Sequence, residues 1–362
     1  MRQVAFVMEQ ALGHVTHTNN VRSALREHPE VAASWATVEF GVTGWARRIP
    51  VYRSNWTVRA GLRARRELRR LARTTQLDAA YFHTQVPAVL AGRWLRRLPS
   101  VVSVDATPRQ YDQLGEAYGH DPGPAWLERV KWRLNRDCFR RAVRVVAFSD
   151  WVKQGLVEDY EVAPDKIEVI RPGIDLDRWR VPERRRTPDR GPLRVLFVGG
   201  DFARKGGPLL QEAFAALGDL DAELHVVTRK EVPVGPGVVL HTGVSGNSAE
   251  LHALFEQADV FCLPTNGDTL GLVFLEAGAS GLPCVATDVG AVAEVVRHGE
   301  TGTVIEPGDL DALVAALREL LTDDDLRERY GRAARRHVET SYDSRANTRR
   351  IVELCETVAG SR

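Results

Sequence analysis

The sequence lacks the features that mark membrane-spanning, secreted and zinc-binding chains. No apolar run reaches the ~18 residues of a membrane span, and no basic segment with a long apolar one precedes the first predicted strand at Val4. The four cysteines have none of the C-x-x-C spacing typical of zinc and redox sites; they are Cys138, Cys262, Cys284 and Cys355. We therefore expect reduced cysteines and a cytoplasmic protein without a signal peptide.

Net charge is also nearly absent, at +1, but the two halves of the chain differ in sign. Residues 1–190 contain 33 Lys and Arg against 22 Asp and Glu, and the remainder contains 16 against 26. A chain of 362 residues with 44% hydrophobic residues is globular in composition and long for one core. Length and charge together predict two domains with different partners.

Residues 259–308 carry the strongest local pattern. A buried strand at Val260–Leu263 leads through a turn to a helix expected from about Gly271 to Ser280, and a second strand and a Gly-rich loop follow. The first helical amides, those of Gly271, Leu272 and Val273, lack intrahelical acceptors and could therefore bind an anion.

Two acids flank this predicted anion site. Asp268 lies just before the helix, and Glu276 lies about two turns inside it. From there the Glu276 carboxylate could reach hydroxyl groups of a ligand whose anionic group binds at the helix start. Taken alone, both acids also fit an ordinary solvated helix surface.

The spacing of the two acids favours the first interpretation. Asp268-x7-Glu276, followed by A-x-A-S-G-L-P-C-V-A-T-D-V-G, resembles the signature of the retaining glycosyltransferases of the glycogen-synthase-like family 4. That family usually has Glu at the first position, one methylene longer than Asp268. The resemblance implies an α/β protein of the GT-B fold, in which two Rossmann-like domains face a cleft and a C-terminal helix crosses back to the N-domain.

Strand-like segments agree with two doubly wound α/β domains, because helical patterns separate them. They are expected at 4–9, 35–40, 78–83, 101–106, 143–149 and 166–170, and then at 193–200, 222–229, 238–244 and 260–263. We expect an N-terminal acceptor domain over 1–180 with the helix of 343–362, a Pro- and charge-rich linker at 181–192, and a nucleotide-sugar domain over 193–342.

A second phosphate-binding pattern opens the nucleotide-sugar domain. A strand, a glycine turn and the basic pair Arg204-Lys205 precede a helix expected from about Pro208. In the family an Arg follows the first Gly and a Lys stands five positions later in a Lys-Gly pair. Lys205-Gly206 matches the second element, whereas Gly200 replaces the Arg, so we expect Arg204 to supply that charge.

The resemblance also assigns the remaining donor contacts. Lys205, Arg204 and the amides of Gly271–Val273 would hold the diphosphate, Glu276 the ribose and Asp268 the hydroxyls of the transferred sugar. Thr228, Arg229 and Thr242, which end the two following strands, would flank the nucleotide base. Neither a metal nor a cofactor is expected, because the Asp175-x-Asp177 spacing is typical of a capped turn.

Three residues of the N-terminal half are candidates for the acceptor side. Asp105 ends a strand where the family usually has a His near the donor sugar; it would bind sugar hydroxyls, stabilise an oxocarbenium-like transition state or act as a base. The alternative is that Asp105 only caps the turn before Pro108. His14 and His17 lie in a loop, before a helix expected over 18–26, which in the family meets acceptor or pyrophosphate. They are candidate acceptor contacts, or loop histidines without a role.

Two arginine-rich helical segments, 53–73 and 125–141, characterise the N-terminal half, and the second carries Trp126, Trp132 and Phe139. Basic helices with Trp suit an anionic membrane surface. A solvated arginine-rich face and an anionic soluble acceptor are the alternatives. Nucleic acid is not expected as a partner, because no recognised binding module accompanies the charge.

The sequence therefore predicts a retaining glycosyltransferase with Asp105, Lys205 and Asp268 as catalytic residues. It would move a sugar from a UDP- or GDP-type donor to an acceptor hydroxyl, on a glycan or a lipid-linked glycan. Two other functions remain open: a sugar-nucleotide epimerase, and a nucleotide-sugar-binding protein without catalysis. The predicted location is cytoplasmic, with a peripheral membrane position as the alternative.

Overall fold

The computed structural model describes residues 1–11, 14–41, 52, 55–115, 123–182 and 191–361. The chain divides into two compact units, here the N-unit and the C-unit. Among the described residues, the N-unit takes those of Met1–Gln113, Asp121–Gly173 and Ser344–Arg362, and the C-unit takes those of Leu114–His120 and Ile174–Asp343. The predicted linker at 181–192 lies mostly outside the described residues.

The N-unit contains a six-stranded parallel sheet in the order β2-β1-β3-β4-β5-β6. Its strands are β1 Arg2–Gln10, β2 Val31–Glu39, β3 Ala79–His83, β4 Ser100–Val104, β5 Arg144–Ala147 and β6 Ile167–Val169. Its helices are α1 His14–Ala24, α3 Trp56–Thr74, α4 Gln85–Val89, α5 Gly92–Arg97, α6 Pro108–Gln113, α8 Ala125–Arg141, α9 Asp150–Tyr160 and α16 Ser344–Gly360.

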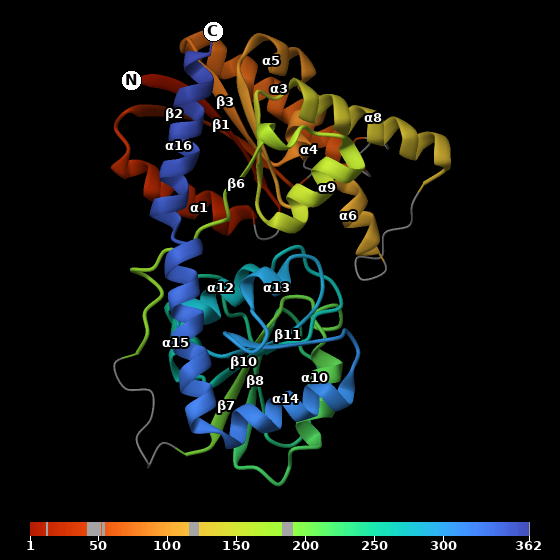
Figure 1. The fold of residues 1–362 in the computed structure, drawn as a ribbon, viewed down its shortest axis with the longest axis vertical. Coiled ribbons are helices and arrows are strands. Elements are labelled where there is room, and N and C mark those ends of the chain that lie inside the picture. Colours follow the sequence, from red (N-terminus) through yellow and green to blue (C-terminus); the bar gives the residue numbers. More distant parts are fainter. Residues whose placement is uncertain (12–13, 42–51, 53–54, 116–122, 183–190, 362) are drawn as a thin grey trace. The chain divides into compact units, whose positions relative to one another are not determined.

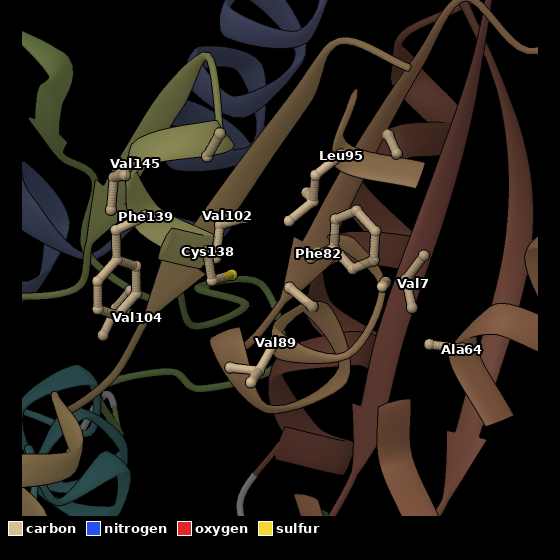
Figure 2. Packing of buried hydrophobic residues seen from close by; sticks show 14 of the residues in the cluster. Val7, Ala64, Phe82, Val89, Leu95, Val102, Val104, Cys138, Phe139 and Val145 are labelled. Atoms are coloured by element: carbon tan, nitrogen blue, oxygen red, sulfur yellow. The ribbon is translucent and has the colours of Figure 1, made fainter. Parts of the chain in front are cut away.

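Alternation along the strands divides the N-unit core into two layers. Val7 of β1 and Phe82 of β3 pack with α3, α4, α5 and α8 on one face, as Figure 2 shows. Their neighbours Phe6 and Tyr81 pack on the other face with α1 and α16. Because successive strand residues point to opposite faces, apolar residues at consecutive positions require helices on both sides.

The C-terminal helix α16 belongs to the N-unit, as predicted. Its buried side chains, among them Ile351 and Cys355, join the core layer that contains Phe6. Helix α16 packs against α1 and against β3 and β4 (Figure 1). The chain thus returns to its first domain after completing the second.

The C-unit contains a second six-stranded parallel sheet, in the order β12-β11-β10-β7-β8-β9. Its strands are β7 Leu193–Val198, β8 Ala222–Thr228, β9 Val238–Thr242, β10 Val260–Leu263, β11 Cys284–Thr287 and β12 Gly302–Ile305. Its helices are α10 Gly207–Ala215, α11 Ala249–Gln257, α12 Leu272–Ala279, α13 Val292–Val295, α14 Leu310–Thr322 and α15 Asp324–Ser341. The strand order turns back beside β7 and β10, which is where doubly wound sheets bind ligands.

The predicted start of the first helix is wrong. Helix α1 begins at His14, one turn earlier than the expected 18–26, so His14 and His17 are helical. The buried face of α1 consists of His17, Thr18, Val21 and Ala24. A histidine and a threonine at core positions concealed the first turn from an apolar pattern.

Two further expectations concern cysteines and membrane spans. All four cysteines are free, as predicted, and all four are buried. Over the described ranges, no helix is both long and apolar enough to cross a bilayer.

Candidate active site

The site in the C-unit forms because β7 and β10 are neighbours in a parallel sheet. The segments that follow them, 199–206 and 264–271, therefore leave the sheet at the same edge. The backbone amide of Asn266 donates to the Arg204 carbonyl at 2.9 Å, and Arg204 Nη1 donates to the Gly267 carbonyl at 2.6 Å. These bonds hold the two predicted phosphate-binding segments together.

The two segments approach so closely that glycine is required at position 206. Gly206 has φ of +77°, and a Cβ there would lie 1.9 Å from the carbonyl oxygen of Pro264. The glycine of the Lys-Gly pair therefore has a steric reason that is independent of any ligand.

Lys205 and Asp268 meet at this edge. The Lys205 ammonium donates to Asp268 Oδ2, and the two side chains are only 13% and 12% exposed. Removing one member of such a sheltered pair leaves a charge uncompensated, which costs about 3–5 kcal/mol. The predicted phosphate ligand and the predicted sugar ligand are thus one ion pair.

Helix α12 begins beside that pair. Its N-cap, Gly271, has φ of +73°, and a Cβ there would lie 2.6 Å from the Phe274 ring and 3.4 Å from Asp268 Oδ2. The following amides, of Leu272 and Val273, lie in the first turn, where no intrahelical acceptor exists and the helix dipole is positive. A cation and a helix N-terminus therefore lie at one edge of the sheet.

Glu276 lies in the middle of α12, and its side chain is partly buried. Withdrawal from water raises the pKa of this carboxyl from its ordinary value of 4.5 to about 8. This carboxyl therefore holds its proton to a higher pH than a solvated one, and when protonated it can donate a hydrogen bond as well as accept one.

A second cluster lies at the carboxyl ends of β3 and β4 in the N-unit. His14 Nδ1 lies 3.0 Å from His83 Nε2, and His14 Nε2 lies 3.7 Å from Asp105 Oδ2. His83 Nδ1 lies 3.2 Å from the Ser103 hydroxyl. His14 thus links an accessible carboxylate, 25% exposed, to a wholly buried imidazole.

His17 lies beneath that cluster. Its ring is 3% exposed and packs at a tilt against the rings of His83 and Phe148, with centroids 4.5 Å and 5.0 Å away. Burial, and then the charge of His14, lower the pKa of His17 to about 3. His17 is therefore neutral and packs against His83. Its predicted contact with an acceptor stays a prediction.

The capping alternative for Asp105 does not agree with the local hydrogen bonds. The Thr107 hydroxyl accepts from the backbone amide of Gln110 at 3.2 Å, and the side-chain oxygen of Gln110 accepts from the backbone amide of Thr107 at 3.0 Å. Thr107 therefore caps α6, and the partner that the described residues give Asp105 is His14.

The acids at Asp175 and Asp177 form a capped turn, as predicted. Asp175 Oδ1 accepts from the amides of Asp177 and Arg178 at 3.1 Å and 3.3 Å. Across the described stretches, no three His, Cys, Asp or Glu side chains gather as metal ligands would. Independence from metal stays a prediction.

Two family models match the chain: "Glycosyltransferase Family 4" over residues 13–178, and "Glycosyl transferases group 1" over residues 235–337. Glycogen synthase from Mycobacterium tuberculosis is 30% identical over 307 residues, which cover 79% of this chain and 70% of that protein. The chain belongs to the group 1 glycosyltransferases. Other curated relatives are matched over about half of their own length, between 47% and 59%.

Solved structures agree with this glycosyltransferase in fold. Sucrose-phosphate synthase from Thermosynechococcus elongatus superposes with a TM-score of 0.81 at 17% identity, over 100% of both chains. Alr3699/HepE from Anabaena, solved with UDP-glucose, gives a TM-score of 0.69 at 14% identity, over 99% of this chain and 100% of that one. The predicted GT-B class, with two Rossmann-like domains, is thereby confirmed.

Two buried residues near the N-unit cluster have no role predicted from the sequence. Glu9, 3% exposed at the end of β1, accepts from the Trp56 indole at 2.6 Å and the Thr84 hydroxyl at 2.7 Å. His83 is fully buried at the end of β3. Both lie at carboxyl ends of central strands, where ligands collect in such sheets; the sequence marked His83 as such a strand end but gave no signal for Glu9.

The raised pKa of Glu276 predicts a pH dependence of stability. A carboxyl that holds its proton more tightly when folded stabilises the protein most below its ordinary pKa of 4.5, and this contribution falls as the pH rises to about 8. Glu276→Gln removes the titration. Between pH 5 and pH 8, the unfolding free energy of the wild type should fall relative to Glu276→Gln, by at most about 1.4 kcal/mol per pH unit.

Chemical denaturation at several pH values measures this difference. Glu212→Gln, on the exposed side of α10, is the matched control and should follow the wild type throughout. Parallel stability curves for the wild type and Glu276→Gln would contradict the burial of an ionisable Glu276.

Proposed function

We propose that this glycosyltransferase moves a sugar from a UDP- or GDP-type nucleoside diphosphate donor to a hydroxyl of a glycan or lipid-linked glycan. The transfer would retain the configuration of the anomeric carbon and need no metal. The C-unit would bind the donor and the N-unit the acceptor.

The observation that carries the proposal is the edge of the C-unit sheet at which Lys205, Asp268 and the start of α12 meet. A diphosphate that leaves in the reaction develops negative charge, and an ammonium and unpaired helical amides stabilise that charge without rearrangement. Support also comes from Alr3699/HepE, a protein of similar fold that was solved with UDP-glucose.

Each donor group then has a partner. Lys205 and the amides of Leu272 and Val273 would bind the phosphates, Glu276 the ribose hydroxyls, and Asp268 the hydroxyls of the sugar. Arg204 would assist at the phosphates, although its guanidinium already bonds to Gly267 and lies 3.5 Å from Asp201. Asp268 would also hold Lys205 in place before the donor arrives.

In the N-unit, Asp105 and His14 would act near the anomeric carbon and the acceptor. The bond from that carbon to the diphosphate breaks, the acceptor oxygen bonds to the same face, and the diphosphate leaves with the electron pair. The acceptor's proton passes to the departing diphosphate. Asp105 would stabilise the positive charge that develops on the sugar.

The first test is transfer itself, measured with a panel of sugar nucleotides and the variant Lys205→Met. Methionine keeps the aliphatic stem and removes the charge, so donor affinity should fall about 10- to 100-fold, the range for one charged hydrogen bond. Lys230→Met, at an exposed position after β8, should leave affinity unchanged. Product anomers identified by NMR report on retention.

Three results would contradict the proposal. Conversion of the sugar nucleotide without any acceptor would indicate an epimerase. Donor binding without turnover on any glycan or lipid-linked glycan would indicate a binding protein. Equal donor affinity in Lys205→Met and the wild type would remove the assigned diphosphate site.

Asp105→Asn should reduce turnover more than donor affinity, because the neutral amide no longer stabilises positive charge at the anomeric carbon. We expect kcat to fall at least about tenfold, the equivalent of 1.4 kcal/mol, with little change in the donor dissociation constant. Asp159→Asn is matched, since that carboxylate is also 25% exposed and ion-paired. Unchanged turnover at saturating donor would make Asp105 structural.

A lipid-linked acceptor would agree with one exposed face of α8. Trp126, Val130 and Leu134 are 66%, 41% and 41% exposed, and their spacing of four places them in one row. Arg129 and Arg133 are exposed beside that row. Apolar residues flanked by arginine suit an anionic bilayer surface.

The other two aromatic residues of α8 face inward. The Trp132 indole donates to the Asp159 carbonyl at 2.8 Å, and Phe139 is fully buried in the core (Figure 2). A membrane contact through α8 therefore depends on Trp126.

Binding to phosphatidylglycerol-containing vesicles should be measurable by co-sedimentation and should weaken as salt rises. Trp126→Ala should weaken it by about tenfold, because one large apolar side chain no longer enters the bilayer surface. Phe40→Ala, which removes a 50% exposed aromatic residue away from α8, is the control. Absence of binding at low salt, or equal binding by Trp126→Ala, would contradict the membrane contact.

A further inference from the structure

Gly200 is the position at which this chain departs from the basic pattern of its phosphate-binding segment. The space above Gly200 is filled by another residue. A Cβ built on Gly200 would lie 2.8 Å from Nε, 3.2 Å from Cζ and 3.3 Å from Cδ of Arg229. The Arg229 guanidinium therefore lies directly on the glycine.

The neighbouring glycine has the same relation to Lys205. A Cβ on Gly199 would lie 2.9 Å from Cβ and 3.1 Å from Cγ of Lys205. Gly199 and Gly200 thus leave room for two cationic side chains, the stem of Lys205 against Gly199 and the guanidinium of Arg229 against Gly200.

The sheet explains how a residue 29 positions later in the sequence reaches this place. Strands β7 and β8 are parallel neighbours, and the Gly199 amide donates to the Val227 carbonyl at 2.9 Å. Arg229 directly follows β8, so it leaves the sheet at the same edge as Gly200. Because position 200 is glycine, the Arg229 guanidinium can lie over the segment that follows β7.

The charge of Arg229 is uncommitted, unlike that of Arg204. Within the part of the chain that the structure describes, Arg229 has no hydrogen bond, ion pair or ring contact, and it is exposed. Arg204 uses its guanidinium to bond Gly267 and lies near the Asp201 carboxylate. A planar fork of free N–H donors suits a phosphate group.

We propose that Arg229 supplies the second cation of the diphosphate site, in the space that a side chain at position 200 would otherwise occupy. This inference rests on the proposed function, since it presupposes a nucleoside diphosphate donor. Arg229 would then bind the diphosphate instead of the nucleotide base, and Arg204 would no longer be needed as a diphosphate ligand. Arg204 then acts as a positioning residue that joins the two phosphate-binding segments.

Calorimetric titration with UDP and GDP, and with the corresponding monophosphates, tests the assignment. The tighter-binding diphosphate is then used for the variants. Arg229→Ala should weaken diphosphate binding about 10- to 100-fold, the range for a charged hydrogen bond, and weaken monophosphate binding several-fold less. Lys230→Ala removes the same charge one residue later and should bind both nucleotides as the wild type does.

A positional swap gives a second measurement. In Gly200→Arg/Arg229→Ala the guanidinium comes from the segment after β7 instead of the segment after β8, so diphosphate affinity should return to within about threefold of the wild type. Thermal unfolding of each variant identifies any that has lost the fold. Arg229→Lys, which keeps the charge but loses the fork, should bind between the wild type and Arg229→Ala.

The outcomes distinguish a failure of the Arg229 assignment from a failure of the proposed function. Equal losses for diphosphate and monophosphate in Arg229→Ala would place Arg229 at the base, and unchanged binding would remove it from the site. A folded double variant as weak as Arg229→Ala would overturn the shared position. If the wild type binds no nucleoside diphosphate at all, the proposed function fails, and this inference fails with it.

Discussion

The ion pair between Lys205 and Asp268 is the interaction on which the rest of the proposed donor site depends. It joins the segment after β7 to the segment after β10, and both side chains are largely withdrawn from water. Removing either member would leave a sheltered charge without its partner, so Asp268 holds the Lys205 side chain in place before any ligand is bound. In the proposed function, the ammonium would exchange the carboxylate for a phosphate oxygen when a diphosphate binds, and the released Asp268 carboxylate would accept hydrogen bonds from sugar hydroxyls.

In the N-unit, imidazoles instead of an ammonium lie beside the candidate carboxylate. His17 and His83 are buried, and burial lowers the pKa of both. Both imidazoles are therefore neutral. His83 contacts His14, whose ring lies 3.7 Å from the partly exposed Asp105. An acid at 105, where the family usually has a histidine, therefore comes together with a histidine on α1. The two chemical groups of an acid–base pair are both present, although they come from different elements.

Much of the fold and part of the site could be predicted from the sequence, because both depend on local patterns. Apolar strands, glycine turns and the Asp268-x7-Glu276 spacing identified two Rossmann-like domains and the start of α12. Contacts between distant side chains could not be predicted. Arg229 reaches Gly200 through the pairing of β7 with β8, and His17 is a core residue whose polarity concealed the first turn of α1. No local pattern encodes either contact.

A crystal structure of the protein with a bound nucleoside diphosphate sugar would test the proposed donor site most directly. We expect both phosphates at the carboxyl edge of the C-unit sheet, within hydrogen-bond distance of Lys205 Nζ and of the backbone amides of Leu272 and Val273. We also expect the ribose hydroxyls at Glu276. Phosphates bound elsewhere, with the Lys205–Asp268 pair unchanged and unliganded, would contradict this assignment.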